Sequence, residues 1–226
     1  MPISLTRPVP ANFSDAHIDA QRYRDMYQQS LDDPETFWAE MANEFLDWDH
    51  TWDTVVRYDF SKGDAEWFAG GKLNVSYNCI DRHLPQRADQ TALIWEGDDP
   101  ADCKHITYGE LKDHVCRLAN TLKARGVRKG DRVCIYMPMI PEAAFAMLAC
   151  TRIGAVHSVV FGGFSPEALK DRILDSNCQT LITADEGVRG GKKVSLKANA
   201  DKALAVCPNI HTCLVVKHTG GNIEWH

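Results

Sequence analysis

The chain has 226 residues and a formal net charge of −6 at pH 7. This length is enough for one large hydrophobic core or two small ones. The acidic balance argues against a nucleic-acid-binding surface, which requires clustered positive charge. No apolar run approaches the roughly 20 residues that span a bilayer, and the N-terminus lacks the basic-then-apolar pattern of a signal peptide.

The eight cysteines are scattered along the chain, and several fall inside apolar helix or strand patterns. We therefore expect reduced, mostly buried thiols of a cytoplasmic protein. Cys207, His211 and Cys213 come close together in sequence, but their spacing is not C-x-x-C and no second pair follows. We expect no zinc or other metal site there.

The first 90 residues are predicted to form N-terminal helices and an extended cap segment. A polar helix is expected from Ser14 to about Leu31, and Asp33 then caps a second helix that has Pro34 at its first position. The tryptophan-rich stretch that follows favours short strands and loops. A short helix is expected over Ser76–Leu84.

Residues 91–226 show alternating strand and helix patterns with short connections. Thr107 and Glu110 form a capping box at the start of a helix that ends at Gly126. Strands are predicted over Thr91–Glu96, Arg132–Met137, Val156–Val160, Thr180–Thr183 and Thr212–Val216. Further helices are predicted from Pro141 to Gly154, over Pro166–Ser176 and over Val194–Val206. Apolar strands without alternation predict an α/β fold, with a mostly parallel, doubly wound sheet and helices on both faces.

A first candidate binding loop, Phe161-Gly162-Gly163-Phe164, lies between a strand and a helix. Ser165 can cap that helix. Loops at the carboxyl ends of parallel strands are where open α/β sheets bind ligands. The alternative is that the two glycines serve only a tight turn. The spacing does not match the G-x-G-x-x-G dinucleotide fingerprint.

A second candidate loop, Arg189-Gly190-Gly191-Lys192-Lys193, follows the next strand. Two glycines allow a close backbone approach, three cations flank them, and the amides of a helix starting near Val194 could assist. This composition suits a phosphate group, and the alternative is a solvated basic loop. We expect the two loops to lie after adjacent elements and to share one sheet edge, where they would suit a ligand with a phosphate and a flat ring.

Other polar residues suggest less. The acidic pairs Asp98-Asp99 and Asp185-Glu186 are predicted to lie on turn and loop surface. The histidines show neither the H-E-x-x-H spacing nor the context of a catalytic triad, and no G-x-S-x-G nucleophile elbow occurs.

Several segments together resemble the acetyl-coenzyme A synthetases, a branch of the adenylate-forming superfamily. The resemblance runs from about Ser14 to the last residue. Its most specific parts are the asparagine-cysteine-x-aspartate-arginine-histidine segment and the phenylalanine-glycine-glycine-phenylalanine-serine segment. The segments concerned are Trp67–His83, Tyr108–Leu111, Tyr136–Glu142, Gly154–Leu169 and Arg189–Lys192.

The resemblance implies a magnesium-dependent ligase that joins acetate to coenzyme A. ATP and acetate would first give acetyl-adenylate and pyrophosphate, and coenzyme A would then give the thioester and AMP. By motif, Phe161, Gly162 and Gly163 would lie along the adenine end of coenzyme A. Arg189, Gly190, Gly191 and Lys192 would hold its 3′-phosphate region. Many relatives have arginine where this chain has Lys192, which keeps the charge but loses the bidentate fork.

The family is much longer than this chain, and its phosphate loop, acetate pocket and catalytic lysine find no match here. The expectation is therefore an N-terminal portion whose residues 91–226 form an incomplete first subdomain of the AMP-binding domain. It would carry part of the coenzyme A site and no catalytic residue, and would be inactive alone. ATP and Mg²⁺ would bind mostly outside it, and its partners would be small molecules and the rest of the parent chain, not nucleic acid or membrane. The alternatives are a sibling that uses propionate or acetoacetate, and a non-catalytic α/β binding module.

Overall fold

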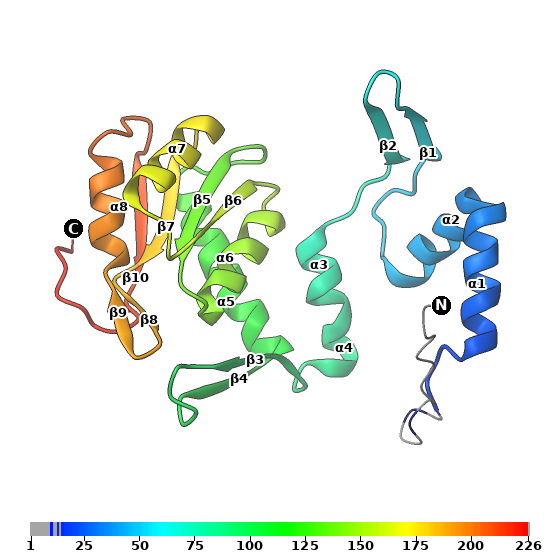
Figure 1. Ribbon diagram of the computed structural model, residues 1–226, viewed down its shortest axis with the longest axis horizontal. Coiled ribbons are helices and arrows are strands. Elements are labelled where there is room, and N and C mark those ends of the chain that lie inside the picture. The colour runs from blue at the N-terminus through cyan, green and yellow to red at the C-terminus, as the bar shows by residue number, and fades with distance from the viewer. Residues whose placement is uncertain (1–9, 11–12, 14, 226) are drawn as a thin grey trace, which may run out of the picture. The chain divides into compact units, whose positions relative to one another are not determined.

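The computed structural model describes residues 10, 13 and 15–225 and divides into two compact units, Met1–Lys72 and Leu73–His226 (Figure 1). The contacts divide the chain after Lys72. The domain boundary that the sequence predicts after residue 90 stays a prediction. Each unit has its own secondary structure.

The first unit contains helices α1 (Ala20–Asp32) and α2 (Pro34–Phe45). Ser14, where the sequence placed the first helix start, lies outside the described residues; α1 begins at Ala20 because Asp19 caps it by accepting from the Arg22 N–H. Asp33 ends α1 and caps α2, as predicted, by accepting from the Thr36 N–H at 3.1 Å.

An antiparallel hairpin, β1 (Thr54–Asp59) and β2 (Asp64–Ala69), completes this unit and confirms the predicted short strands. Trp48, Trp52 and Phe68 pack against one another with ring centroids 4.9–5.6 Å apart. A Cβ at Gly71 would lie 2.7 Å from the Trp48 ring, so this aromatic cluster requires glycine there.

The second unit begins with three short turns where the sequence predicted one helix. They are α3 (Val75–Cys79), the 3₁₀ turn η2 (Asp81–His83) and α4 (Leu84–Arg87). The predicted strand β3 (Thr91–Glu96) follows. It pairs antiparallel with β4 (Cys103–Thr107), a strand that the sequence analysis missed, and this hairpin lies outside the parallel sheet.

The long helix α5 (Tyr108–Ala124) starts at the predicted capping box. The Glu110 N–H donates to Thr107 Oγ1 at 3.2 Å, and the Glu110 carboxylate accepts from the Thr107 N–H at 2.9 Å. Leu111, Val115 and Leu122 then bury one face of the helix. A local sequence signal therefore sets both the start and the packing face of α5.

The parallel sheet has four strands in the order β10-β7-β5-β6. The strands are β5 (Arg132–Met137), β6 (Val156–Phe161), β7 (Thr180–Ala184) and β10 (Thr212–Val216). The connecting helices are α6 (Pro141–Arg152), α7 (Pro166–Ser176) and α8 (Leu196–Leu204). The chain runs from β5 outward to β6 and then back past β5 to β7 and β10. Right-handed crossovers therefore place α6 on one face of the sheet and α7 and α8 on the other.

The two central strands are the most buried elements. All five residues of β7 and all but Arg132 of β5 are buried, whereas the edge strands β6 and β10 are partly accessible. Continuous apolar burial of this kind is what the sequence pattern predicted for a doubly wound sheet.

A short antiparallel hairpin, β8 (Gly187–Arg189) and β9 (Lys192–Val194), separates β7 from α8. The sequence analysis missed these strands and started the helix near Val194, whereas α8 begins at Leu196. The hairpin carries the basic segment on its own two-residue turn.

All eight cysteines are free thiols. Cys134, Cys150, Cys178 and Cys207 are buried, but Cys79 and Cys103 are exposed, so the expectation of mostly buried thiols holds for only half of them. Burial raises the pKa of both Cys134 and Cys150 to about 12, which keeps these thiols protonated and unreactive. Within the described part of the chain, no helix is both long enough and apolar enough to cross a membrane.

Candidate functional site

A cavity of about 950 Å³ opens at the carboxyl ends of the parallel strands. Its wall takes Pro138 from the end of β5, Gly162 from the end of β6, Gly187 from beyond β7 and His218 from beyond β10. The chain leaves β5 and β7 in opposite directions, and the crevice outside such a switch point is where open α/β sheets bind ligands. The topology and the cavity therefore identify the same place.

The Phe161-Gly162-Gly163-Phe164 loop forms one side of this cavity. A Cβ at Gly162 would lie 2.8 Å from the Met137 carbonyl oxygen, so the loop packs directly on the β5 backbone. The Tyr136 hydroxyl donates to the Phe164 carbonyl at 2.8 Å and holds the far end of the loop. Gly162 therefore packs against the β5 backbone, and the loop also faces the cavity.

The basic segment turns at Gly190 and Gly191, whose φ angles of 57° and 71° lie in the left-handed region that glycine adopts freely. The expected help from helix amides is not in place. Strand β9 comes before α8, and the Lys197 N–H at the start of α8 donates to the Asp185 carbonyl. Any anion at this turn would meet a hairpin tip and not a helix N-terminus.

The two predicted loops do meet. The guanidinium of Arg189 lies over the Phe161 ring, 5.5 Å from its centroid. A Cβ at Gly163 would lie 3.5 Å from Arg189 Nη1. The shared sheet edge is therefore confirmed, but strands β6 and β7 are not neighbours, because β5 lies between them.

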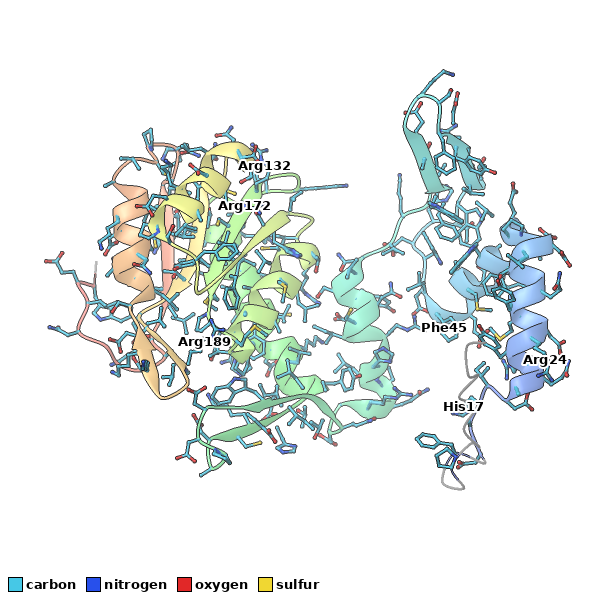
Figure 2. All side chains as sticks on the ribbon, viewed as in Figure 1. His17, Arg24, Phe45, Arg132, Arg172 and Arg189 are labelled. Atoms are coloured by element: carbon cyan, nitrogen blue, oxygen red, sulfur yellow. The ribbon has the colours of Figure 1, made fainter. Side chains whose placement is uncertain are left out.

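The residues of the basic segment take different positions. Arg189 and Gly191 line the cavity, whereas Gly190 and Lys192 are exposed beside it. Lys193 forms an ion pair with Glu186 at 2.8 Å, so this third cation already has an anionic partner within the chain. Figure 2 shows Arg189 at the hairpin end of the sheet, with Arg132 at the opposite end.

Sequence reasoning missed three residues that complete the cavity wall: Trp95, Asp98 and His218. The Trp95 indole N–H donates to the Met139 carbonyl at 2.7 Å, and its ring meets His218 edge-on at 6.2 Å. The only local signal for Trp95 and Asp98 was a Trp-Glu-Gly-Asp-Asp run at the end of a strand, which is equally typical of an ordinary turn, and His218 lies in a separate segment after β10. Tertiary packing alone brings these residues to the site.

Asp185 is buried, so its prediction as loop surface was wrong. Its carboxylate accepts from the backbone N–H groups of Glu186, His218, Thr219, Gly220 and Gly221 at 2.8–3.2 Å. Burial alone would raise the pKa of Asp185, but these donors outweigh it and hold the pKa below its ordinary value of 3.8. The residue ties β7 to the segment after β10 and so supports the cavity wall.

The cavity thus combines a guanidinium, an aromatic face and glycine-rich backbone, which is chemistry for binding an anionic group beside a flat ring. Over residues 10, 13 and 15–225, no group of three or more histidine, cysteine, aspartate or glutamate side chains is arranged to hold a metal ion. The Cys213 thiol near His211 has its pKa raised to about 11 by burial.

Family comparisons agree with this geometry. Residues 80–225 match the sequence profile described as AMP-binding enzyme, and residues 23–79 match the profile described as acetyl-coenzyme A synthetase N-terminus. The chain belongs to the AMP-binding enzyme family. The boundary between the two profiles lies inside the series of short turns α3, η2 and α4.

Curated members of this family are close in sequence. The acetyl-coenzyme A synthetase of Saccharophagus degradans is 64% identical over 220 residues, which is 97% of this chain and 34% of that protein. Acetyl-coenzyme A synthetase 2 of Pseudomonas putida is 67% identical over 210 residues, covering 93% of this chain and 32% of that protein. The chain spans about a third of the length of the curated relatives that it matches.

A solved structure of the family shows the same fold. Acetoacetyl-CoA synthetase from Streptomyces lividans superposes with a TM-score of 0.80 at 27% sequence identity. The match covers 95% of this chain and 33% of that one.

Proposed function

We propose that this chain is the N-terminal part of an AMP-forming acetate–CoA ligase and that it supplies one wall of the coenzyme A site. Identities of 64% and 67% to acetyl-coenzyme A synthetases support the substrate assignment. The contact between Arg189 and Phe161 at the cavity mouth carries the site assignment.

In the proposed reaction, an acetate oxygen attacks the α-phosphorus of ATP and expels pyrophosphate. The coenzyme A sulfur then attacks the carbonyl carbon of acetyl-adenylate and expels AMP. This chain serves only the second step. Phe161, Gly162 and Gly163 would lie along the adenine end of coenzyme A. Arg189, Gly190, Gly191 and Lys192 would hold its 3′-phosphate region.

Charge and shape support these roles. Arg189 offers a fixed fork of donors to a phosphate, and its position over the Phe161 ring restricts its rotamers before any ligand arrives. Lys192 is exposed and contributes a mobile point charge at the rim. A cavity of about 950 Å³ is at the upper end of the usual range for small-molecule sites.

We assign ATP, Mg²⁺ and acetate mainly to sequence outside these 226 residues and expect the chain alone to be inactive. Magnesium would neutralise the phosphates of ATP where that nucleotide binds. The setting of the parent protein is proposed to be the cytoplasm, with small molecules and the remainder of the parent chain as its partners.

The test uses the full-length protein encoded by the gene that contains this chain. It should release pyrophosphate with acetate and ATP, and form acetyl-coenzyme A when coenzyme A is added. Arg189→Ala should raise KM for coenzyme A and leave acetate-dependent ATP–pyrophosphate exchange nearly unchanged, because the phosphate contact serves only the second step. Equal loss in both half-reactions would contradict the assigned role, and pyrophosphate release by the 226-residue chain alone would contradict the placement of the chemistry.

A sibling activity is the second candidate, because acetoacetyl-CoA synthetase shares the fold. That relative is 27% identical, against 64% and 67% for the acetyl-coenzyme A synthetases, so acetate is the first choice. Comparing kcat/KM for acetate, propionate and acetoacetate in the full-length protein decides between them. A reading frame that ends at His226 would instead favour a non-catalytic binding module.

A further inference from the structure

The tip of the β3–β4 hairpin is joined to the tip of the β8–β9 hairpin by one hydrogen bond. The Gly191 N–H donates to Asp98 Oδ2 at 2.8 Å, across 93 positions of sequence. Asp98 and Gly191 both line the cavity described above. The acceptor is a carboxylate, so this is a charge-assisted bond of the stronger kind.

The turn that donates this bond is open, and the β8–β9 strand pairing lies directly below it. Gly190 and Gly191 both have positive φ, and a Cβ built on either would meet no heavy atom within 4 Å. Paired glycines in an open turn have the largest backbone freedom to lose. The β8–β9 pairing holds the flanking Arg189 and Lys192, but without Asp98 the Gly190-Gly191 turn between them would sample several conformations.

Asp98 itself is held on an anchored strand end. Three residues earlier, in β3, Trp95 donates its indole N–H to the Met139 carbonyl. The Gly97 N–H donates to the Asp102 carbonyl at 2.7 Å and closes the hairpin below Asp98. The carboxylate therefore reaches the basic turn from a supported position.

We propose that Asp98 is a positioning residue for the coenzyme A site, an inference that rests on the proposed function. Its carboxylate accepts from the Gly191 N–H and so fixes the conformation of the basic turn. The ligand phosphate then meets the side chains of Arg189 and Lys192. The same negative charge repels that phosphate at short range. Position and charge therefore act in opposite directions, and two substitutions separate them.

Asp98→Ala removes the bond and the charge, whereas Asp98→Asn keeps an acceptor oxygen for Gly191 and removes only the charge. Asp99 gives the matched control. It lines the same cavity, but its carboxylate accepts from the Ala101 N–H at 2.9 Å within its own turn. Asp99→Ala thus removes a charge at the same tip without freeing the basic turn.

In the full-length enzyme, Asp98→Ala should raise KM for coenzyme A about tenfold, the loss of roughly one charge-assisted hydrogen bond. The kcat and the ATP–pyrophosphate exchange should stay unchanged. Asp98→Asn should stay within about twofold of the parent or bind more tightly, and Asp99→Ala should change KM by less than about twofold. The KM for dephospho-coenzyme A, which lacks the 3′-phosphate, should change little in all three variants.

A KM that is unchanged or lowered in Asp98→Ala would overturn the proposal, as would equal damage from Asp98→Asn. Hydrogen exchange of the peptide spanning residues 187–194, without ligand, gives a readout that needs no activity. Exchange should accelerate in Asp98→Ala and not in Asp98→Asn. If that holds while the parent protein makes no use of coenzyme A, only the proposed function fails. If coenzyme A is used and exchange does not change, the positioning role fails.

Discussion

The guanidinium of Arg152 at the end of α6 donates to both carboxylate oxygens of Asp81 in η2, at 2.6 and 2.8 Å. The two side chains are only 24% and 17% exposed, so solvent screens this pair weakly. Asp81→Asn should lower the free energy of unfolding by about 2 kcal/mol, because it leaves the arginine without its counter-charge. Urea denaturation measures this change in the free energy of unfolding. Asp175 is exposed, so Asp175→Asn serves as the control and should change stability by less than about 0.5 kcal/mol.

The same pair predicts a pH dependence. The hydrogen bonds from Arg152 hold the pKa of Asp81 below its ordinary value of 3.8. A carboxylate with a depressed folded-state pKa stabilises the fold fully above its unfolded pKa and loses that contribution as pH falls through the folded value. The stability difference between the parent chain and Asp81→Asn should therefore be constant near neutral pH and shrink below about pH 4. A difference that grew on acidification would contradict this assignment.

Asp185→Asn should destabilise the chain by about 2–3 kcal/mol, since an amide group has one acceptor oxygen and would turn its NH₂ toward backbone donors. Gly220 and Gly221 both donate to Oδ2, the atom that the substitution would replace. Faster hydrogen exchange in residues 217–221 should accompany the loss. An unchanged melting temperature would show that the segment after β10 does not depend on this carboxylate.

Tyr136→Phe should cost about 1 kcal/mol of stability, because the buried hydroxyl donates to the Phe164 carbonyl and accepts from Asn199. Burial raises the pKa of this tyrosine, so the hydroxyl stays protonated and the effect should be constant up to at least pH 9. Tyr58→Phe on an exposed strand is the control and should be neutral. Chemical denaturation of both variants distinguishes the two positions.

Gly162→Ala should destabilise the chain by about 1–3 kcal/mol, because its Cβ would lie 2.8 Å from a backbone oxygen that cannot move aside. Gly109→Ala is the matched control in helix α5. Its Cβ would meet the Ala88 carbonyl at an ordinary 3.4 Å, so higher helix propensity should leave stability equal or raise it by up to about 1 kcal/mol. Equal thermal shifts in both variants would refute the packing argument for Gly162.

Local signals predicted much of the fold. Asp33 and Pro34 start α2, Thr107 and Glu110 start α5, and Ser165 caps α7 by accepting from the Ala168 N–H. Each of these bonds joins residues three apart in sequence. The strands of the parallel sheet were likewise predictable, because burial on both faces demands continuous apolar runs.

The short hairpins were harder to predict. Strand β4 is mostly exposed and β8 and β9 have three residues each, so none carries an apolar run or a clear alternation. What stabilises them is pairing with a partner strand, and that pairing is not visible in a short window of sequence. The basic segment was therefore recognised by its composition, while its conformation was not.

By itself, the sequence determined the starts of helices α2, α5 and α7, the strands of the sheet and the two loops that hold a cation and an aromatic ring. Only the tertiary structure decided that β5 lies between those loops, that Asp185 is buried under five amides and that Asp98 holds Gly191. Caps and apolar runs act within a few residues and so can be read along the chain. The partners of Asp185 and Asp98 lie up to 36 and 93 residues away, and only the folded sheet brings them within hydrogen-bond distance.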